Sequence, residues 1–298
     1  MASNDPVATA ATATERVGSS RPEVIAAAAA RLGAHASQLA ILLDFDGTLA
    51  PIVDDPAAAA PDPAAASAAR TLATRVALLA CVTGRPALQA RGLLGVDTIA
   101  YTGLHGAEVL QPGAAAPEVP EAFAADGAAV AAIIAQARAE PQGLAGLDLE
   151  EKGPIVALHW RRAVDPLAAQ ARAEELADRA VAAGLRSGTG RAVLELRPAL
   201  ELTKGDGVQA LLSTAPEVRH AVFAGDDVTD LDAFARLRAL VADGTLEGAT
   251  LIAVAGADAP PQVADAADLV LSTPADLGAF LTDVVSHASA ATRPPKGA

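Results

Sequence analysis

The chain is poor in cysteine, in aromatic side chains and in basic residues, and each shortage excludes a class of protein. One cysteine in 298 residues, Cys81, rules out an internal disulfide framework and a zinc site built from several thiolates. Aromatic residues make up only 2%, so the cores must be built from leucine, valine, isoleucine and alanine. The net charge of −14 argues against nucleic acid and anionic membranes as partners, because clustered lysine and arginine bind such surfaces.

Long apolar runs and targeting signals are also missing. We see no apolar stretch of the ~18 residues that a membrane span needs, and no cationic segment followed by an apolar one at the start of the chain. Residues 1–20 are rich in alanine, threonine and serine, which predicts a disordered tail, and residues 291–298 are expected to fray. We therefore expect a soluble cytoplasmic protein without an obligate protein partner.

Short apolar runs alternate with helical patterns over most of the chain. Such runs, separated by helices, are typical of parallel strands that are buried on both faces; they stand at 39–44, 76–82, 98–102, 221–224, 251–254 and 269–271. The middle of the chain differs, because its strand candidates alternate apolar and polar residues. The pattern predicts an α/β fold, with a doubly wound parallel-sheet core formed by residues 21–108 and 196–290 and a small α+β cap inserted at 109–195.

Four of these apolar runs lead into two acids, a hydroxyl and a glycine turn, namely Asp44, Asp226, Thr83 and Gly103. Ligands of open α/β sheets bind outside the carboxyl ends of the strands, so we expect these four residues at one edge. Asp46 stands two residues after Asp44 and can face the same pocket.

A cluster of carboxylates at that edge would repel itself. Two unit charges ~4 Å apart cost about 4 kcal/mol at an effective dielectric constant near 20. A hard cation with oxygen ligands would relieve this repulsion, and Mg²⁺ fits best beside a phosphate. Simpler interpretations remain open at this point, because Asp46-Gly47 is also a common turn dipeptide and Lys204 can be a solvated surface residue.

The segment DFDGT at 44–48 resembles the signature of the haloacid dehalogenase superfamily of phosphohydrolases, and Thr83, Lys204 and the GDD segment at 225–227 match its other markers in order. The resemblance implies that Asp44 attacks phosphorus and forms an aspartyl-phosphate, while Asp46 serves as general acid and base. Thr83 and Lys204 would hold the phosphoryl oxygens. Asp44, Asp46 and Asp226 would bind Mg²⁺.

A narrower resemblance, to the trehalose-6-phosphate phosphatases, extends over about residues 38–280. It rests on the segments GLHGAE (103–108), EEKG (150–153), LHWR (158–161), ELRP (195–198) and GDDVTDLDAF (225–234). It implies that Glu150, Lys152 and Glu195 bind the sugar, which suits a polyol that needs many hydrogen-bonding partners. We add Arg85 and His105 as substrate-binding candidates.

The sequence departs from that family's pattern at Leu231, where the family usually has glutamate, and at Trp160, which replaces a tyrosine. Neither change removes a predicted catalytic group. The expected reaction is hydrolysis of trehalose 6-phosphate to trehalose and phosphate, the last step of trehalose biosynthesis. The alternatives are a phosphatase for another sugar phosphate, such as a sucrose or glucosylglycerol phosphate, a phosphomutase, and a non-catalytic regulatory homologue.

Replacing Asp44 by asparagine tests the assignment of the nucleophile. The amide keeps the size of the side chain but has no anionic oxygen to attack phosphorus, so we expect Asp44→Asn to abolish phosphate release. A variant with near-normal turnover in a phosphate-release assay would refute the assignment.

Overall fold

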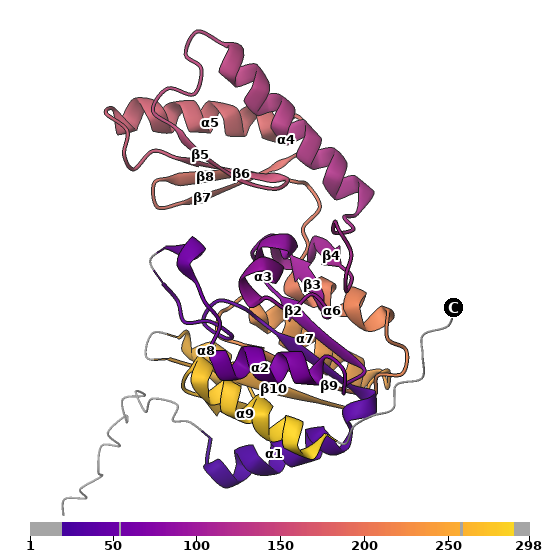
Figure 1. Ribbon diagram of the computed structural model, residues 1–298. Coiled ribbons are helices and arrows are strands. Elements are labelled where there is room, and N and C mark those ends of the chain that lie inside the picture. Colours follow the sequence, from indigo (N-terminus) through magenta and orange to yellow (C-terminus); the bar gives the residue numbers. More distant parts are fainter. Residues whose placement is uncertain (1–19, 54, 257–258, 289–298) are drawn as a thin grey trace, which may run out of the picture.

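A computed structural model describes residues 20–53, 55–256 and 259–288, and Figure 1 shows a large lower unit with a smaller unit above it. The predicted tails lie outside the described residues, apart from Ser20. Cys81 is buried, as expected for a small core residue.

The lower unit, which we call the core, is built on a seven-stranded sheet with the order β11-β10-β9-β1-β2-β3-β4. All neighbouring strands run parallel except β3 and β4, which are antiparallel. The predicted fold class is therefore confirmed. The strands are β1 (Leu39–Leu43), β2 (Leu78–Val82), β3 (Ala100–Gly103), β4 (Glu108–Leu110), β9 (His220–Gly225), β10 (Gly248–Val254) and β11 (Leu269–Leu271).

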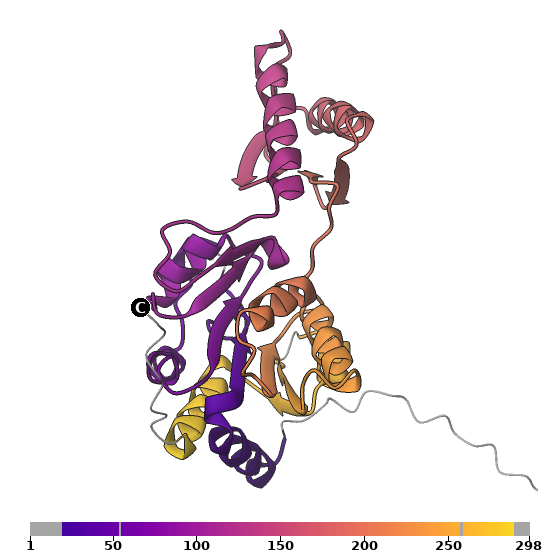
Figure 2. The ribbon, with the colours of Figure 1, turned by 90° about the vertical axis from the view of Figure 1, so that its right-hand side faces the viewer.

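Helices cover both faces of the core sheet (Figures 1 and 2). One face carries α1 (Pro22–Ala34), α2 (Pro63–Leu72), α3 (Ala87–Leu94) and α9 (Pro274–His287), and the other carries α6 (Lys204–Ser213), α7 (Asp230–Ala242) and α8 (Pro261–Ala266). The central strand β1 shows why its sequence is continuously apolar. Leu39, Ile41 and Leu43 pack on the first face, whereas Ala40 and Leu42 pack on the second.

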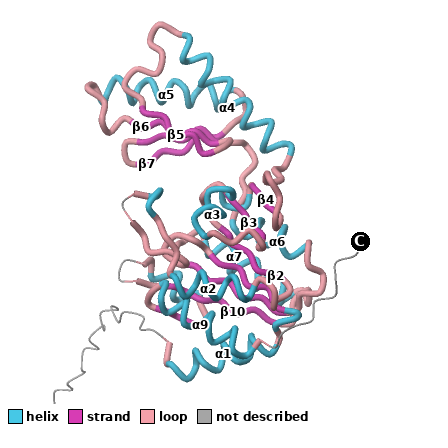
Figure 3. Tube along the Cα trace, in the orientation of Figure 1, coloured by secondary structure: helices cyan, strands magenta, loops and turns pink. Residues whose placement is uncertain are grey.

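The upper unit, the cap, has a four-stranded antiparallel sheet with the order β5-β6-β8-β7. Its elements are α4 (Glu121–Ala139), β5 (Asp148–Lys152), β6 (Ile155–His159), α5 (Pro166–Ala182), β7 (Arg186–Gly190) and β8 (Val193–Arg197). Both helices lie on the side of the sheet away from the core, so the other face of the sheet is turned toward the core (Figures 1 and 3).

The strand pairing bears on where the cap begins and ends. Residues 109 and 110 belong to β4, which pairs with β3 in the core sheet, and β8 continues past residue 195 to Arg197 in the cap sheet. The limits 109–195 stay a prediction, and the sheets place the crossings between the units in the segments 111–120 and 198–203.

Helix α4 qualifies one expectation from the sequence. Among the described residues it is long and apolar enough, by length and composition alone, to cross a membrane, although we expected no such stretch. Its residues Val130, Ile133, Ile134 and Ala137 are buried in the apolar core of the cap. A core helix of a folded domain has the same features.

Hydrogen bonds hold the first crossing to the core and the second crossing to the cap. Backbone hydrogen bonds of 2.7 and 2.9 Å join Val109 and Glu118, so the first crossing stays on the core until that point. Asp126 of α4 accepts a hydrogen bond of 2.8 Å from the backbone amide of Ala199, which ties the second crossing to the cap. A small apolar cluster between the units contains Leu104, Ala107, Phe123, Val119 and Leu202.

A close backbone approach fixes the start of α6. Gly106 has φ of +104°, and a Cβ at this position would lie 2.3 Å from the carbonyl oxygen of Thr203. Thr203 caps α6 through a reciprocal pair of contacts with Asp206. The turn after β3 therefore needs a glycine, and it holds the helix end that carries Lys204.

An ion-pair cluster joins the two helices of the cap. Arg172 and Arg179 of α5 both bind Glu140, which directly follows α4, and the Arg172 Nη2 to Glu140 Oε2 distance is 2.7 Å. The hydrogen bonds from Arg179 and Arg172 lower the pKa of Glu140 to about 2. The cluster therefore stabilises the cap while this carboxylate is ionised.

Glu140→Gln tests this contribution through its pH dependence. The folded-state pKa is depressed, so the stability is present above the ordinary glutamate pKa and is lost as the pH falls toward about 2. We expect the variant to unfold at a lower temperature than the wild type at pH 7, with a difference that shrinks between about pH 4.5 and pH 2. The exposed Glu217→Gln is the control, and a pH-independent difference for Glu140→Gln would contradict the prediction.

Candidate active site

The floor of the site is a lysine held between two buried carboxylates. Asp44 directly follows β1, and its Oδ1 lies 2.8 Å from the Nζ of Lys204, the first residue of α6. The same Nζ lies 2.6 Å from Oδ1 of Asp230, at the start of α7. All three residues are buried. The contact therefore brings together one strand end and the N-termini of two helices.

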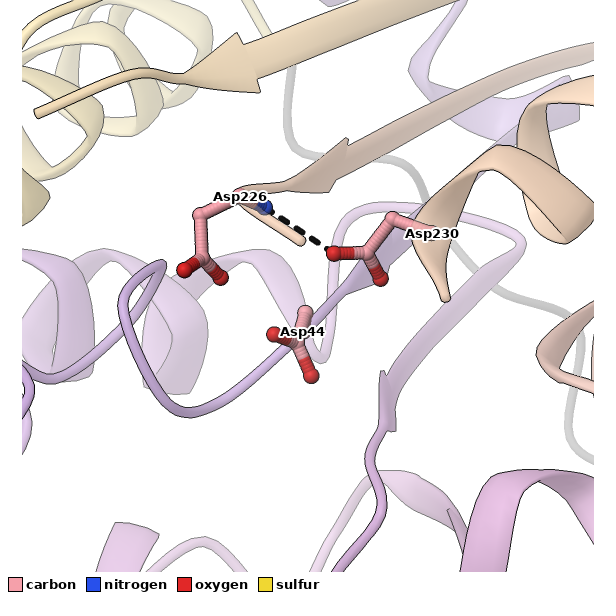
Figure 4. A group of neighbouring side chains, drawn as sticks. All are labelled: Asp44, Asp226 and Asp230. Carbon is pink, nitrogen blue, oxygen red and sulfur yellow. Dashed lines mark hydrogen bonds between the residues drawn. The ribbon is translucent and has the colours of Figure 1, made fainter. Parts of the chain in front are cut away.

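A third carboxylate, from Asp226 at the end of β9, completes a compact acidic group. Asp44, Asp226 and Asp230 each offer an oxygen within 4.8 Å of the others, and Figure 4 shows how they approach from separate segments. The other oxygen of Asp230 accepts hydrogen bonds of 2.9 Å from the backbone amides of Asp226 and Asp227. Thr48 donates to Asp226 Oδ1 at 3.1 Å.

Burial and like charge shift the titration of this group. Burial raises the pKa of Asp44 well above its ordinary value, and Lys204 opposes that shift. Burial, followed by the charge of Asp230, raises the pKa of Asp226 to about 6. Burial lowers the pKa of Lys204, but its two carboxylate partners outweigh burial and raise it. One ammonium faces three carboxylates, which leaves an excess of negative charge.

The donor set fits a hard divalent cation. Carboxylate oxygens are the preferred ligands of such cations, and a bound cation would offset both the burial of these charges and their mutual repulsion, which raise the pKa values of Asp44 and Asp226. Gly47 permits the loop to wrap this group, because it has φ of +77° and a Cβ there would lie 2.0 Å from Asp226 Oδ2.

Asp46 is turned toward Arg85. Its two carboxylate oxygens accept hydrogen bonds of 2.6 Å each from Nε and Nη2 of Arg85. Arg85 also donates to the carbonyl oxygen of Pro56 at 2.7 Å and lies over the ring of Phe45. In the described part of the chain Asp46 is not a member of the three-carboxylate group. Its role as a metal ligand stays a prediction.

Thr83 and His105 lie next to this pair. Thr83 is buried at the end of β2, and its Oγ1 accepts a hydrogen bond of 3.2 Å from the backbone amide of Arg85. His105 has φ of +57°, and its ring lies against Gly84, where a Cβ would be 2.7 Å from Nε2. Burial, aided by Lys204, lowers the pKa of His105, which favours the neutral ring.

A cleft of about 820 Å³ separates these residues from the cap sheet. Its lining includes predicted residues from both sides: Asp46, Arg85, His105 and Lys204 from the core, and Glu150, Lys152 and Glu195 from the cap. Asp44, Thr83 and Asp226 are buried next to the core side of the cleft. The structure therefore brings all the sequence-predicted site residues to one cleft or to its floor.

The cap wall of the cleft is made of charged side chains. Lys152 Nζ lies 3.4 Å from Glu150 Oε2 and 3.4 Å from Glu195 Oε1. His159 Nε2 lies 3.0 Å from Glu150 Oε2, and Arg197 pairs with Glu195. The wall thus offers both donors and acceptors, as a polyhydroxylated ligand requires.

Sequence reasoning missed Asp230 as a site residue. It is the first residue of α7, where an acidic residue is common because it interacts favourably with the helix dipole, so its position alone gives no signal. The signal was present in the GDDVTD segment at 225–230, whose last member is this aspartate. Arg197 and His159 were also left out, although both stand in segments that the sequence singled out.

Lys204→Met tests how far the stability of the site's floor depends on the ammonium group of Lys204. The variant keeps an unbranched side chain but leaves Asp44 and Asp230 buried without a counter-charge, which costs about 3–5 kcal/mol when one partner of a buried pair is removed. We expect a matching loss in the free energy of unfolding at pH 7 in chelator. The loss should diminish as the pH falls, because burial already raises the pKa of Asp44 and protonation removes its unpaired charge. An unchanged unfolding midpoint in urea would contradict this account.

Comparison with known proteins agrees with this geometry. The family model described as trehalose-phosphatase matches residues 42–255. The trehalose-phosphate phosphatase of Mycobacterium marinum is 35% identical over 228 residues, which cover 74% of this chain and 57% of that protein. That of Mycolicibacterium paratuberculosis is 38% identical over 211 residues, covering 67% and 51%. The chain therefore spans about half the length of these curated relatives.

Among solved structures, the C-terminal domain of Candida albicans trehalose-6-phosphate phosphatase has the same fold. It superposes with a TM-score of 0.62 at 22% identity, over 88% of this chain and 96% of that domain. The family model covers more than half of the chain, and it includes both the core residues of the floor and the cap residues of the cleft. The chain belongs to the trehalose-phosphatase family.

Proposed function

We propose that this chain hydrolyses trehalose 6-phosphate to trehalose and phosphate, through an aspartyl-phosphate on Asp44. The observation that carries the proposal is the position of Asp44. It is buried beside Lys204 on the floor of a cleft whose opposite wall is charged and polar. This arrangement suits a substrate that has a phosphoryl group at one end and hydroxyl groups at the other.

The first step transfers the phosphoryl group to the protein. An oxygen of Asp44 attacks phosphorus, the bond between phosphorus and the sugar oxygen breaks, and Asp46 gives its proton to the leaving oxygen. Lys204 favours the ionised form of Asp44, which burial alone would suppress. Asp46 is held by Arg85, so it must leave that contact, at least in part, to reach the leaving group.

The second step returns the protein to its starting state. Asp46 takes a proton from water, the water oxygen attacks phosphorus, and the bond between phosphorus and Asp44 breaks to release phosphate. Thr83 and Lys204 are the proposed partners of the phosphoryl oxygens. A group transfer of this kind depends mainly on positioning and on charge neutralisation, which these residues are placed to supply.

Asp44 and Asp226 are the proposed protein ligands of Mg²⁺, and Asp230 stands beside them. When bound, the cation would neutralise charge on the phosphoryl group. Asp46 was predicted as a further ligand, but its carboxylate is engaged by Arg85 in this structure. A contribution from the Asp46 carboxylate would require it to leave that partner.

Glu150, Lys152 and Glu195 are the proposed contacts of the sugar. They stand on the cleft-lining face of the cap, opposite the residues that would handle the phosphoryl group. Because the two groups lie on separate units, movement of the cap would decide whether both act on one substrate. Arg85 and His105 line the same cleft on the core side.

Phosphate release from a panel of sugar phosphates tests the proposal. With Mg²⁺ we expect rapid release from trehalose 6-phosphate and much slower release from glucose 6-phosphate, which lacks the second ring that the cap would contact. Chelation with EDTA should abolish activity, because the carboxylate cluster then keeps its excess charge. Re-addition of Mg²⁺ should restore it.

Sucrose 6-phosphate and glucosylglycerol phosphate belong in the same panel, and Asp44→Asn is the control for contaminating phosphatases. A higher kcat/KM for either of them would replace the proposed substrate while keeping the reaction. No release from any sugar phosphate in the presence of Mg²⁺, or full activity in EDTA, would refute the proposed function.

A further inference from the structure

A row of four residues crosses the cleft-facing side of the cap sheet. Glu150 of β5 pairs with Ala157 of β6, Ala157 pairs with Glu195 of β8, and Glu195 pairs with Gly188 of β7. Long acidic side chains therefore alternate with the two smallest residues along the row. Both acids are proposed sugar contacts; Ala157 lies between them, and Gly188 lies on the other side of Glu195.

Ala157 is fully buried although its strand position faces the cleft. Its neighbours Val156 and Leu158 point to the opposite face and pack in the apolar core beneath α4 and α5. Ala157 consequently points toward the cleft, yet it has no exposed surface. Burial on this face requires cover from side chains of the neighbouring strands, and the pairing puts Glu150 and Glu195 directly beside Ala157.

The side chain of Lys152 is in a position to cover Ala157. Its Nζ lies 3.4 Å from both Glu150 and Glu195, which stand on strands separated by β6. Strands lie about 4.8 Å apart, so the backbones of the two glutamates are about 10 Å from each other. Lys152 itself pairs with Ile155, two residues before Ala157 on β6, so a side chain that reaches both glutamates extends across β6 toward the position of Ala157.

Gly188 leaves a similar space on the other side of Glu195. A Cβ on Gly188 would lie 3.6 Å from Cζ and from Nε of Arg197, so the guanidinium extends over this glycine. Arg197 Nε donates to Glu195 Oε2 at 2.8 Å. Burial raises the pKa of Glu195, but Arg197 and Lys152 outweigh it and the net shift is downward. Glu195 is thus clamped by one cation on each side.

We propose that Ala157 and Gly188 are positioning residues for the sugar subsite, because their small size lets Lys152 and Arg197 lie along the sheet and hold Glu195 in place. The inference rests on the proposed function and adds specificity determinants to it. Neither residue need touch the substrate. A larger side chain at either position would lift the cation above it and separate the charged groups that the sugar hydroxyls would meet.

Ala157→Val is the main test. Valine favours strands, so the cap is expected to fold, but its two extra methyl groups stand where Lys152 lies. We expect KM for trehalose 6-phosphate to rise about tenfold or more, with a smaller change in kcat. For p-nitrophenyl phosphate, which has no sugar to place, kcat/KM should stay within about twofold of the wild type.

Val156→Ala is the matched control, because it alters the adjacent residue on the opposite face. It weakens the apolar core of the cap and lowers its stability, yet it leaves the charged row intact. KM for trehalose 6-phosphate should therefore stay near the wild-type value. Ala157→Ser, which adds little volume, should also remain close to the wild type.

The outcomes separate the inference from the proposed function. An unchanged KM for folded Ala157→Val, or an equal loss of activity with both substrates, would overturn the inference. If the wild type prefers another sugar phosphate, the proposed substrate is wrong, and the same comparison is made with the preferred one. If Ala157→Val does not fold, Gly188→Val on the edge strand takes its place, with the same expected rise in KM and the same overturning result.

Discussion

The ammonium of Lys204, shared between Asp44 and Asp230, is the contact on which the rest of the core depends. A carboxylate this deeply buried is costly unless a counter-charge meets it at close range. The contact exists only if the end of β1 and the first turns of α6 and α7 converge within hydrogen-bonding distance. The parallel sheet supplies the first element, while the Gly106 turn and the Thr203 cap fix the second.

This constraint explains why the residues proposed for chemistry and those proposed for sugar binding lie on different units. A buried ion pair tolerates little displacement, so the groups proposed for chemistry belong to the rigid core. The residues proposed to bind the sugar lie instead on the separate sheet of the cap. Two short crossings join the units, and hydrogen bonds at Val109 and Ala199 hold the first crossing to the core and the second to the cap.

The sequence was informative where one physical requirement dominated. Strand β1 was predicted because both of its faces are buried, so every residue in it is apolar. Strands β5 and β7 were missed because they are the edges of the cap sheet, and their sequences, DLEEK and RSGTG, have little apolar content. Their positions depend on pairing with β6 and β8. The resemblance in the chain identified the active-site segments, but it could not show that Asp46 faces Arg85 or that Asp230 shares Lys204. Both contacts join residues that are far apart in sequence.

The chain is strongly negative, and its proposed substrate is an anion. The two can bind only if the charges at the floor of the site balance locally. At the floor the ammonium of Lys204 pairs with two of the three clustered carboxylates, which leaves an excess of negative charge, so a phosphoryl group that arrived alone would meet net repulsion. A divalent cation bound to the same carboxylates would cancel this excess of negative charge and so remove the net repulsion. Each ligand then increases the affinity for the other by the same factor, because the coupling free energy between two bound ligands is reciprocal. In the proposed reaction the acidic cluster, which disfavours phosphate by itself, therefore makes phosphate binding conditional on the metal.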